Sequence, residues 1–174
     1  MRCTLAFVAL VALSAAADDA VPTSGVDVVL VGATGNLAKK YLWQILFDLH
    51  LKDGVSRVFA GATKPKEKGT ALIEEILDER IKCAETVSAD VCAAQRVKFR
   101  GAVQYYQLRA DEQYADLGSA LDATGNPGRL FFLSVSPDYY PQIAKNIDTH
   151  ARPKGGAPGA GAKPWLRVIF EKPF

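Results

Sequence analysis

The residues best suited to chemistry stand where an apolar run meets two glycines. Residues 28–31 are all apolar, and Gly32 and Gly35 follow them before a helix-like pattern begins. Gly32 permits a sharp exit from a buried strand, and Gly35 has no Cβ to keep a phosphate from the backbone. Ala38 takes the third small position, where a helix packs on a sheet. A strand, a tight turn and a helix N-terminus are typical of a site for a dinucleotide pyrophosphate.

Backbone amides are expected to provide most of the phosphate contacts at this turn. The NH groups from Thr34 to Leu37 would point at the phosphate, aided by the helix dipole, and the Thr34 hydroxyl is a further donor. Asn36 can cap the helix. The predicted cofactor-binding residues of the turn are Gly32, Ala33, Thr34, Gly35, Asn36, Leu37, Ala38 and Lys39.

The choice between NAD and NADP depends on the residues after the second predicted strand, residues 58–62. An acid there would hydrogen-bond the ribose of NAD, whereas basic residues suit the 2′-phosphate of NADP. Residues 60–63 include no acid, and Lys64, Lys66 and Lys68 follow. We predict that Lys64 contacts NADP, with NAD tolerated, because a flexible lysine holds phosphate more loosely than the planar fork of arginine. For any one of these lysines, an ordinary solvated position is the alternative.

Three segments, taken with their order and spacing, are a more specific signal of a protein family than the glycine turn alone. They are residues 32–40, residues 129–147 and residues 165–174, the last ending in Glu-Lys-Pro-Phe. Together they resemble the glucose-6-phosphate dehydrogenase family. The Tyr-Leu-Trp of residues 41–43, after a pair of lysines, is similar to the lumenal hexose-6-phosphate dehydrogenase branch of the endoplasmic reticulum. The likeness implies an NAD(P)-binding Rossmann domain over residues 26–174, the N-terminal part of a longer dehydrogenase.

This resemblance assigns roles to residues outside the glycine turn. It implies that Tyr140 lies beside the nicotinamide half of the cofactor, and that Lys172 contacts both the cofactor and a sugar phosphate substrate. The implied reaction is the oxidation of glucose 6-phosphate to 6-phosphogluconolactone in the pentose phosphate pathway, with NADP as hydride acceptor. Asn36 stands where the family usually has aspartate, which puts in doubt any role that needs the negative charge.

The same resemblance places the general base downstream of Glu-Lys-Pro-Phe. In the family it is a histidine paired with an aspartate, and it takes the proton as hydride leaves. His50 and His150 fall at predicted helix ends, and we interpret both as surface or capping residues. We therefore expect neither a catalytic residue nor a substrate domain in this chain, and no turnover by the chain alone.

The first residues have the pattern of a secretory signal. Residues 1–13 carry one early positive charge and a short apolar run, small residues follow to Ala17, and an acidic pair comes next. We predict a signal peptide over residues 1–17, with a buried N-terminal helix as the alternative. The mature chain is then expected in the endoplasmic reticulum lumen or the secretory pathway.

Two cysteines remain in the predicted mature chain. Cys83 and Cys92 form an even pair, and in an oxidising lumen such a pair is a candidate disulfide. The lumenal branch carries cysteines at similar spacing. Two free cysteines on helix faces are the alternative. The intervening segment is too short and too poor in other ligands for a metal site.

The pattern of the remaining residues predicts strands that alternate with helices. This alternation is typical of a Rossmann-like α/β fold, a parallel sheet with helices on both faces. Helices are expected with inward stripes at Leu37, Tyr41, Ile45 and Leu49, then at Leu72, Ile73, Ile76 and Leu77, then at Tyr114, Leu117 and Leu121, and over residues 139–150. Strands are expected over residues 58–62, within 97–108, and over 130–135 and 166–170, and the glycine-rich segment 151–164 is expected to be a surface loop.

Composition narrows the function classes. The net charge of +2 is too small to indicate a nucleic-acid partner, and no apolar run is long enough to predict a membrane span. A small sugar phosphate and, in the full-length enzyme, a second copy of the chain are the expected partners. A short-chain-type reductase is one alternative, although no tyrosine has lysine four residues later. A nucleotide-binding module without catalysis is the other.

Overall fold

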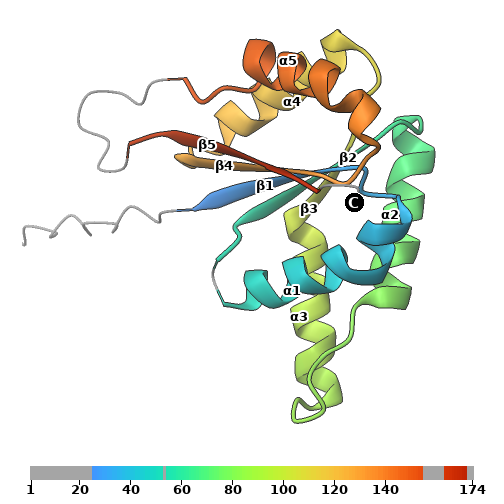
Figure 1. The fold of residues 1–174 in the computed structure, drawn as a ribbon. Helices are drawn as coiled ribbons and strands as arrows, with labels where there is room; N and C mark the ends of the chain where they lie inside the picture. The colour runs from blue at the N-terminus through green and yellow to red at the C-terminus, as the bar shows by residue number, and fades with distance from the viewer. Residues whose placement is uncertain (1–24, 53, 155–162, 172–174) are drawn as a thin grey trace, which may run out of the picture.

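The computed structural model describes residues 25–52, 54–154 and 163–171. They form a five-stranded, wholly parallel sheet in the order β3-β2-β1-β4-β5 (Figure 1). The strands are β1 (Val26–Val31), β2 (Arg57–Ala62), β3 (Val103–Gln107), β4 (Gly128–Leu133) and β5 (Trp165–Phe170). Because β1 is the central strand, the residues that follow it lie in the middle of the carboxyl edge. The predicted signal peptide, residues 1–17, lies outside the described residues.

Helices cover both faces of this sheet, which confirms the predicted Rossmann-like fold (Figure 1). The helical elements are η1 (Ala38–Leu42), α1 (Trp43–Leu51), α2 (Lys66–Arg80), α3 (Ala89–Ala102), α4 (Asp111–Ala123), η2 (Pro137–Tyr139) and α5 (Tyr140–His150). Successive β1 side chains enter opposite cores: Val28 and Leu30 pack with α1, α2 and α3, whereas Val29 and Val31 pack with α4 and α5. Within the described residues, no helix has the length and apolar character needed to cross a membrane.

The buried face of the first helix differs from the prediction. Tyr41, Ile45 and Leu49 were expected to face the core, but their exposed fractions are 59%, 50% and 42%. The residues that face the core are Ala38, Trp43, Leu46, Phe47 and His50. The reason is local: η1 is a π-helical turn, which takes more residues per turn than an α-helix and so rotates the face that follows it.

The prediction for His50 was also wrong. This residue is buried at the end of α1, where Nδ1 donates to the carbonyl of Val55 at 2.9 Å and the ring packs on Phe99. It is therefore part of the core rather than a surface or capping residue.

The third strand lies within residues 97–108, as predicted. It is Val103–Gln107, and the residues before it, Gly101 included, belong to α3. Ser88 begins α3, because its hydroxyl accepts a hydrogen bond from the amide of Val91 at 3.4 Å. The structure joins Cys92 of α3 to Cys83 by a disulfide. This bond ties α3 to the segment that follows α2.

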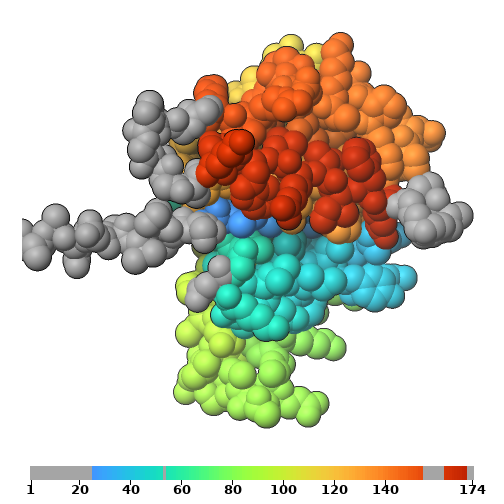
Figure 2. Space-filling view, turned by 60° about the vertical axis from the view of Figure 1, so that its left-hand side comes forward, coloured from blue at the N-terminus to red at the C-terminus, as the bar shows by residue number. Residues whose placement is uncertain are grey.

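The last two strands lie nearly where they were predicted. β4 begins and ends two residues earlier than the predicted strand over 130–135, and β5 begins one residue before the predicted 166. β5 is an edge strand, and Figure 2 shows it (red) at the surface. The predicted loop 151–164 lies between α5 and β5, and its residues 155–162 are outside the described part of the chain.

A buried carboxylate ties the amino end of β1 to the turn before β4. Asp27 is fully buried and accepts hydrogen bonds from the Thr124 hydroxyl at 2.5 Å and the Asn126 amide at 2.7 Å. Burial raises the pKa of Asp27 above its ordinary value, although these two bonds act to lower it. The carboxylate is therefore structural, and it joins segments far apart in sequence.

A buried guanidinium at the same edge joins β4 to α4 and α5. Arg129 is only 3% exposed; it donates to the Asp122 carboxylate and, at 3.0 Å, to the carbonyl of Ala151. Lys154 also pairs with Asp122, at 2.7 Å. Burial acts to raise the pKa of Asp122, but the hydrogen bonds from Arg129 and Lys154 lower it below the ordinary value.

Candidate nucleotide-binding site

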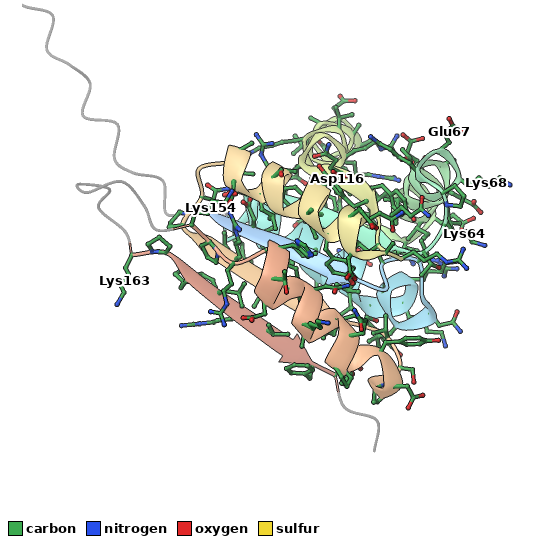
Figure 3. All side chains as sticks on the ribbon, turned by 90° about the horizontal axis from the view of Figure 1, so that it is seen from above. Lys64, Glu67, Lys68, Asp116, Lys154 and Lys163 are labelled. Carbon is green, nitrogen blue, oxygen red and sulfur yellow. A yellow bond between two sulfur atoms is a disulfide. The ribbon has the colours of Figure 1, made fainter. Side chains whose placement is uncertain are left out.

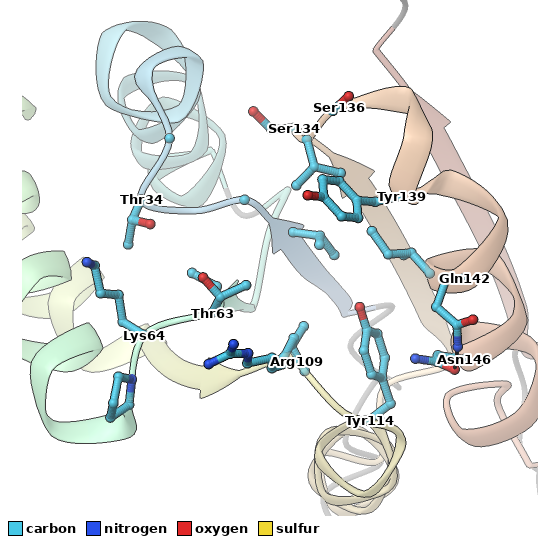
Figure 4. Close-up of a pocket in the computed structure, with 18 residues that line it drawn as sticks. Thr34, Thr63, Lys64, Arg109, Tyr114, Ser134, Ser136, Tyr139, Gln142 and Asn146 are labelled. Carbon is cyan, nitrogen blue, oxygen red and sulfur yellow. Dashed lines mark hydrogen bonds between the residues drawn. The ribbon is translucent and has the colours of Figure 1, made fainter.

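A cavity of about 890 Å³ lies at the carboxyl edge of the sheet (Figure 4). In open parallel sheets this edge, near the central strand, is where ligands bind. The lining residues come from the ends of four strands and from the helices that follow them. They are Val31, Gly32, Thr34, Gly35, Ala62, Thr63, Lys64, Pro65, Leu108, Arg109, Tyr114, Ser134, Val135, Ser136, Tyr139, Gln142, Ile143 and Asn146.

The glycine turn has the geometry that the sequence predicts. Gly32 has φ of 89°, a conformation that other residues rarely adopt, and a Cβ there would lie 2.2 Å from the carbonyl oxygen of Ser134. The amides of Gly32 and Ala33 donate to the carbonyl of Gly61 at 2.8 and 3.0 Å, which joins the ends of β1 and β2. Only glycine can occupy position 32 without moving the end of β4.

Three amides of the turn are available to a ligand. The Gly35 amide donates to the Gly32 carbonyl at 2.9 Å, so one amide of the predicted run from Thr34 to Leu37 is used within the turn. In the described part of the chain, the amides of Thr34, Asn36 and Leu37 donate to no protein acceptor. They precede a helix, where free NH groups attract anions.

Trp43, which sequence reasoning did not assign to the site, supports the glycine turn from the core side by a hydrogen bond. Its fully buried indole donates from Nε1 to the carbonyl of Ala33 at 2.9 Å. Ala33 and Ala38 are themselves fully buried, so Ala38 packs on the sheet as predicted. Asn36 is exposed, and neither Asn36, Leu37 nor Lys39 lines the cavity.

Two cations and two threonines form one side of the cavity. Figure 4 shows Thr34, Thr63, Lys64 and Arg109 on this side, with the Arg109 guanidinium directed toward Thr63 and Lys64. The Tyr105 hydroxyl donates to the Lys64 carbonyl at 2.7 Å and so fixes the loop. Among the described residues, no acid lines the cavity. Sequence reasoning missed Arg109, although its position directly after the third strand was a usable signal.

The opposite side of the cavity is formed by α4, η2 and α5. Gln142 donates to the side-chain oxygen of buried Asn146 at 3.0 Å. Burial, with a smaller contribution from Asp111, raises the pKa of Tyr114 to about 12. Tyr114 is therefore a neutral hydrogen-bonding group at pH 7 and cannot act as a general base.

On the α5 side, Tyr139 lines the cavity, whereas Tyr140, the predicted cofactor contact, does not. Tyr140 turns toward β5: its hydroxyl donates to the carbonyl of Glu171, and its ring meets Phe170 edge-to-face with centroids 5.1 Å apart. Successive residues at the start of a helix point about 100° apart, so the two neighbouring side chains face different sides. Lys172, the other predicted contact in this region, lies outside the described residues.

The described lining residues carry groups suited to holding a charged ligand. No histidine, aspartate or glutamate lines the cavity, so the described lining offers no general base for removing a proton. The lining offers the Thr34 amide, in a turn with two more unbonded amides, for a phosphate, two cations for further negative charge, and several apolar side chains. Those are the parts of a dinucleotide site.

The family comparison agrees with this geometry. Residues 29–174 match the family model "Glucose-6-phosphate dehydrogenase, NAD binding domain". The chain belongs to the glucose-6-phosphate dehydrogenase family. The matched domain supports a nicotinamide dinucleotide as the ligand of the cavity.

Relatives differ in how much of their length this domain represents. The GDH/6PGL endoplasmic bifunctional proteins of Homo sapiens and Oryctolagus cuniculus are 41% and 42% identical over 86% of this chain and 19% of their own. The glucose-6-phosphate 1-dehydrogenase of Chlamydia muridarum is 29% identical over 84% of this chain and 30% of its own. The chain thus spans about a fifth of the first two relatives and less than a third of the other.

The fold is also that of a solved family member. A structure described as "Glucose-6-phosphate dehydrogenase in complex with its substrate glucose-6-phosphate" superimposes with a TM-score of 0.64. The superposition covers 86% of this chain and 31% of the other, at 22% identity. This likeness concerns the fold alone.

Proposed function

We propose that this domain binds NADP, with NAD tolerated, and serves as the cofactor domain of a dehydrogenase that oxidises glucose 6-phosphate to 6-phosphogluconolactone. The observation that carries the proposal is that the glycine turn, with its unbonded amides, reaches the cavity at Gly32, Thr34 and Gly35, where Lys64 and Arg109 also line it and no described lining residue is acidic. Nicotinamide, when bound, supplies hydride acceptance.

The residues of this chain contribute binding and orientation. The amides of Thr34, Asn36 and Leu37 hold the pyrophosphate, which places the adenosine half beyond β2 and the nicotinamide half beyond β4. On the β4 side, Ser134 and Tyr139 line the space for the nicotinamide. The sugar phosphate substrate and the contacts of Lys172 belong to the same proposal, as does the assembly of the longer enzyme as a homo-oligomer.

The cofactor part of the proposal is tested by titrating the purified chain with NADP⁺ and NAD⁺ in a calorimeter. We expect saturable binding of both, tighter for NADP⁺, and no production of NADPH when glucose 6-phosphate is added. The absence of turnover follows because general base catalysis alone contributes on the order of 10²–10⁴-fold. Turnover by the purified chain would show that the described cavity includes catalytic groups that we have not recognised.

The proposed dehydrogenase activity is tested on the protein that the transcript encodes. We propose sequencing it beyond the codon for Phe174 and assaying the encoded protein for NADPH production that depends on glucose 6-phosphate. Activity in the longer product would support the proposal. An immediate stop codon, together with dinucleotide binding, would favour a nucleotide-binding module without catalysis.

We also propose that the protein resides in the endoplasmic reticulum lumen or the secretory pathway. The signal-like residues 1–17, the Cys83–Cys92 disulfide and the two endoplasmic relatives support this location. Expression of the full chain with a C-terminal tag tests it. Retention of residues 1–17 on a cytosolic product would contradict the proposal.

A further inference from the structure

We propose that Arg109, at the end of β3, is a specificity-determining residue that holds the 2′-phosphate of NADP together with Lys64. The inference rests on the proposed function and adds a residue to it. The predicted selectivity site at the end of β2 has only a lysine as its cation, and Arg109 supplies from the neighbouring strand the planar cation that β2 lacks.

Strand register brings Arg109 to the adenosine side of the cavity. Ala62 of β2 pairs with Gln107 of β3, and the amide of Leu108 donates to the carbonyl of Ala62 at 2.7 Å. The loops after β2 and β3 therefore begin side by side at the carboxyl edge, with Thr63 and Lys64 in one and Leu108 and Arg109 in the other. In Figure 4 the Arg109 side chain extends across the cavity floor toward Thr63 and Lys64. The ribose that carries the 2′-phosphate lies beyond the end of β2 in this fold class.

The backbone of Arg109 is fixed while its guanidinium is left free. The side-chain oxygen of Gln113 accepts hydrogen bonds from the amides of Arg109, at 2.5 Å, and Ala110, at 3.0 Å. Asp111, the nearest acid in sequence, is turned to Gln142, at 3.4 Å. Within the described residues, no carboxylate lies within the 4.0 Å of an ion pair with Arg109.

The ligand chemistry that suits this arrangement is a phosphate monoester. Such a group carries up to two negative charges and three acceptor oxygens, so it gains from two cations at once. Arginine can donate two parallel hydrogen bonds to it, whereas Lys64 acts as a compact point charge. NAD has a hydroxyl at this position and gains little from either residue. Arg109 thus favours NADP over NAD instead of strengthening both.

The test compares NADP⁺ and NAD⁺ affinities of the full chain with those of Arg109→Gln. Because a charge-assisted pair is lost, we expect NADP⁺ affinity to fall about 10- to 100-fold and NAD⁺ affinity to change less than about 2-fold. Arg109→Lys should retain part of the NADP⁺ preference. Arg57→Gln, an exposed arginine at the start of β2, removes the same charge at the opposite edge and should change neither affinity.

Thermal melting of each variant establishes that the fold is kept. Equal losses for both cofactors in Arg109→Gln, or no loss for either, would overturn the role of Arg109 and leave the proposed function standing. A wild-type chain that binds neither cofactor would overturn the proposed function and the role of Arg109 together.

Discussion

The two edges of the sheet use polar side chains in opposite ways. At the amino edge, Asp27 and Arg129 are buried and bonded to neighbouring protein groups, with only Nε of Arg129 lacking a partner. At the carboxyl edge, Thr34, Lys64 and Arg109 line a cavity, and the unbonded amides of Asn36 and Leu37 follow Thr34 in the turn. Figure 3 shows Lys64 and Lys154 at opposite ends of the molecule.

This difference separates polar groups that hold the fold from those that are available to a ligand. Arg129 and Arg109 both stand next to a strand, and composition treats them alike. Burial and bonding distinguish them, since a buried polar group must be satisfied within the protein, whereas a group that faces a cavity can be satisfied by a ligand. Substitutions at the amino edge should therefore change stability, and those at the carboxyl edge should change binding.

The largest expected effect is on stability at the amino edge. Arg129→Met removes the guanidinium from Asp122 and leaves the Ala151 carbonyl without its donor, so it should destabilise the fold by about 3 kcal/mol. Urea unfolding of the purified chain measures this loss. The matched variant Arg109→Met at the other edge should change stability by less than about 0.5 kcal/mol. Similar losses in the two variants would remove the distinction between the edges.

The second effect is on binding at the carboxyl edge. Gly35→Asp places a carboxylate where the pyrophosphate should lie, and we expect NADP⁺ affinity to fall about 100-fold, or about 2.7 kcal/mol. A Cβ at this position would lie 3.1 Å from the Gly32 carbonyl oxygen and 3.8 Å from that of Ser134, so the fold should survive with a small adjustment. Calorimetry measures the binding, and Gly35→Ala is the control, with a smaller loss expected. Unchanged affinity in Gly35→Asp would show that the pyrophosphate lies elsewhere.

A smaller effect links the two properties through Trp43. Trp43→Phe keeps a ring in the core but removes the Nε1 bond to the Ala33 carbonyl, at a cost of about 1–2 kcal/mol in stability. Because this bond positions the glycine turn, NADP⁺ affinity should fall as well. Unfolding and calorimetry on the same sample test both parts. The control Trp165→Phe, on the edge strand β5, should change neither stability nor NADP⁺ affinity. If Trp43→Phe lost stability but kept its affinity, the glycine turn would not need the indole.

The smallest expected effect is a pair of opposite pH dependences at the amino edge. Burial raises the folded-state pKa of Asp27, so its contribution is greatest at low pH and is lost as pH rises through that raised value. The pKa of Asp122 is lowered in the folded state, so its contribution is present above the ordinary value of 3.8 and is lost as pH falls below it.

The pH effects are measured by comparing wild type with Asp27→Asn and Asp122→Asn in urea unfolding between pH 7 and pH 3. The advantage of wild type over Asp27→Asn should grow as pH falls from 7, and its advantage over Asp122→Asn should shrink near the acid end. The same direction of change in both comparisons would contradict the assigned environments.

Features that depend on neighbouring residues in the chain could be predicted from the sequence. The apolar run of β1, the glycines after it and the alternation of strand and helix patterns are local, and they determined the fold class and the position of the phosphate turn. The family was recognisable for the same reason, since its motifs are short and ordered. Gly32, Gly35 and Lys64, which the sequence predicts to bind the cofactor, line the cavity.

Features that depend on contacts between distant residues were decided only by the tertiary structure. The π-helical turn at Ala38–Leu42 rotates the first helix, so Trp43 rather than Tyr41 enters the core and reaches the glycine turn. Tyr139 replaces Tyr140 at the cavity because the start of α5 fixes which side chain turns inward. Parallel pairing of β2 with β3 brings Arg109 to the same side of the cavity as Lys64, although the two are far apart in sequence, and no local pattern encodes that placement.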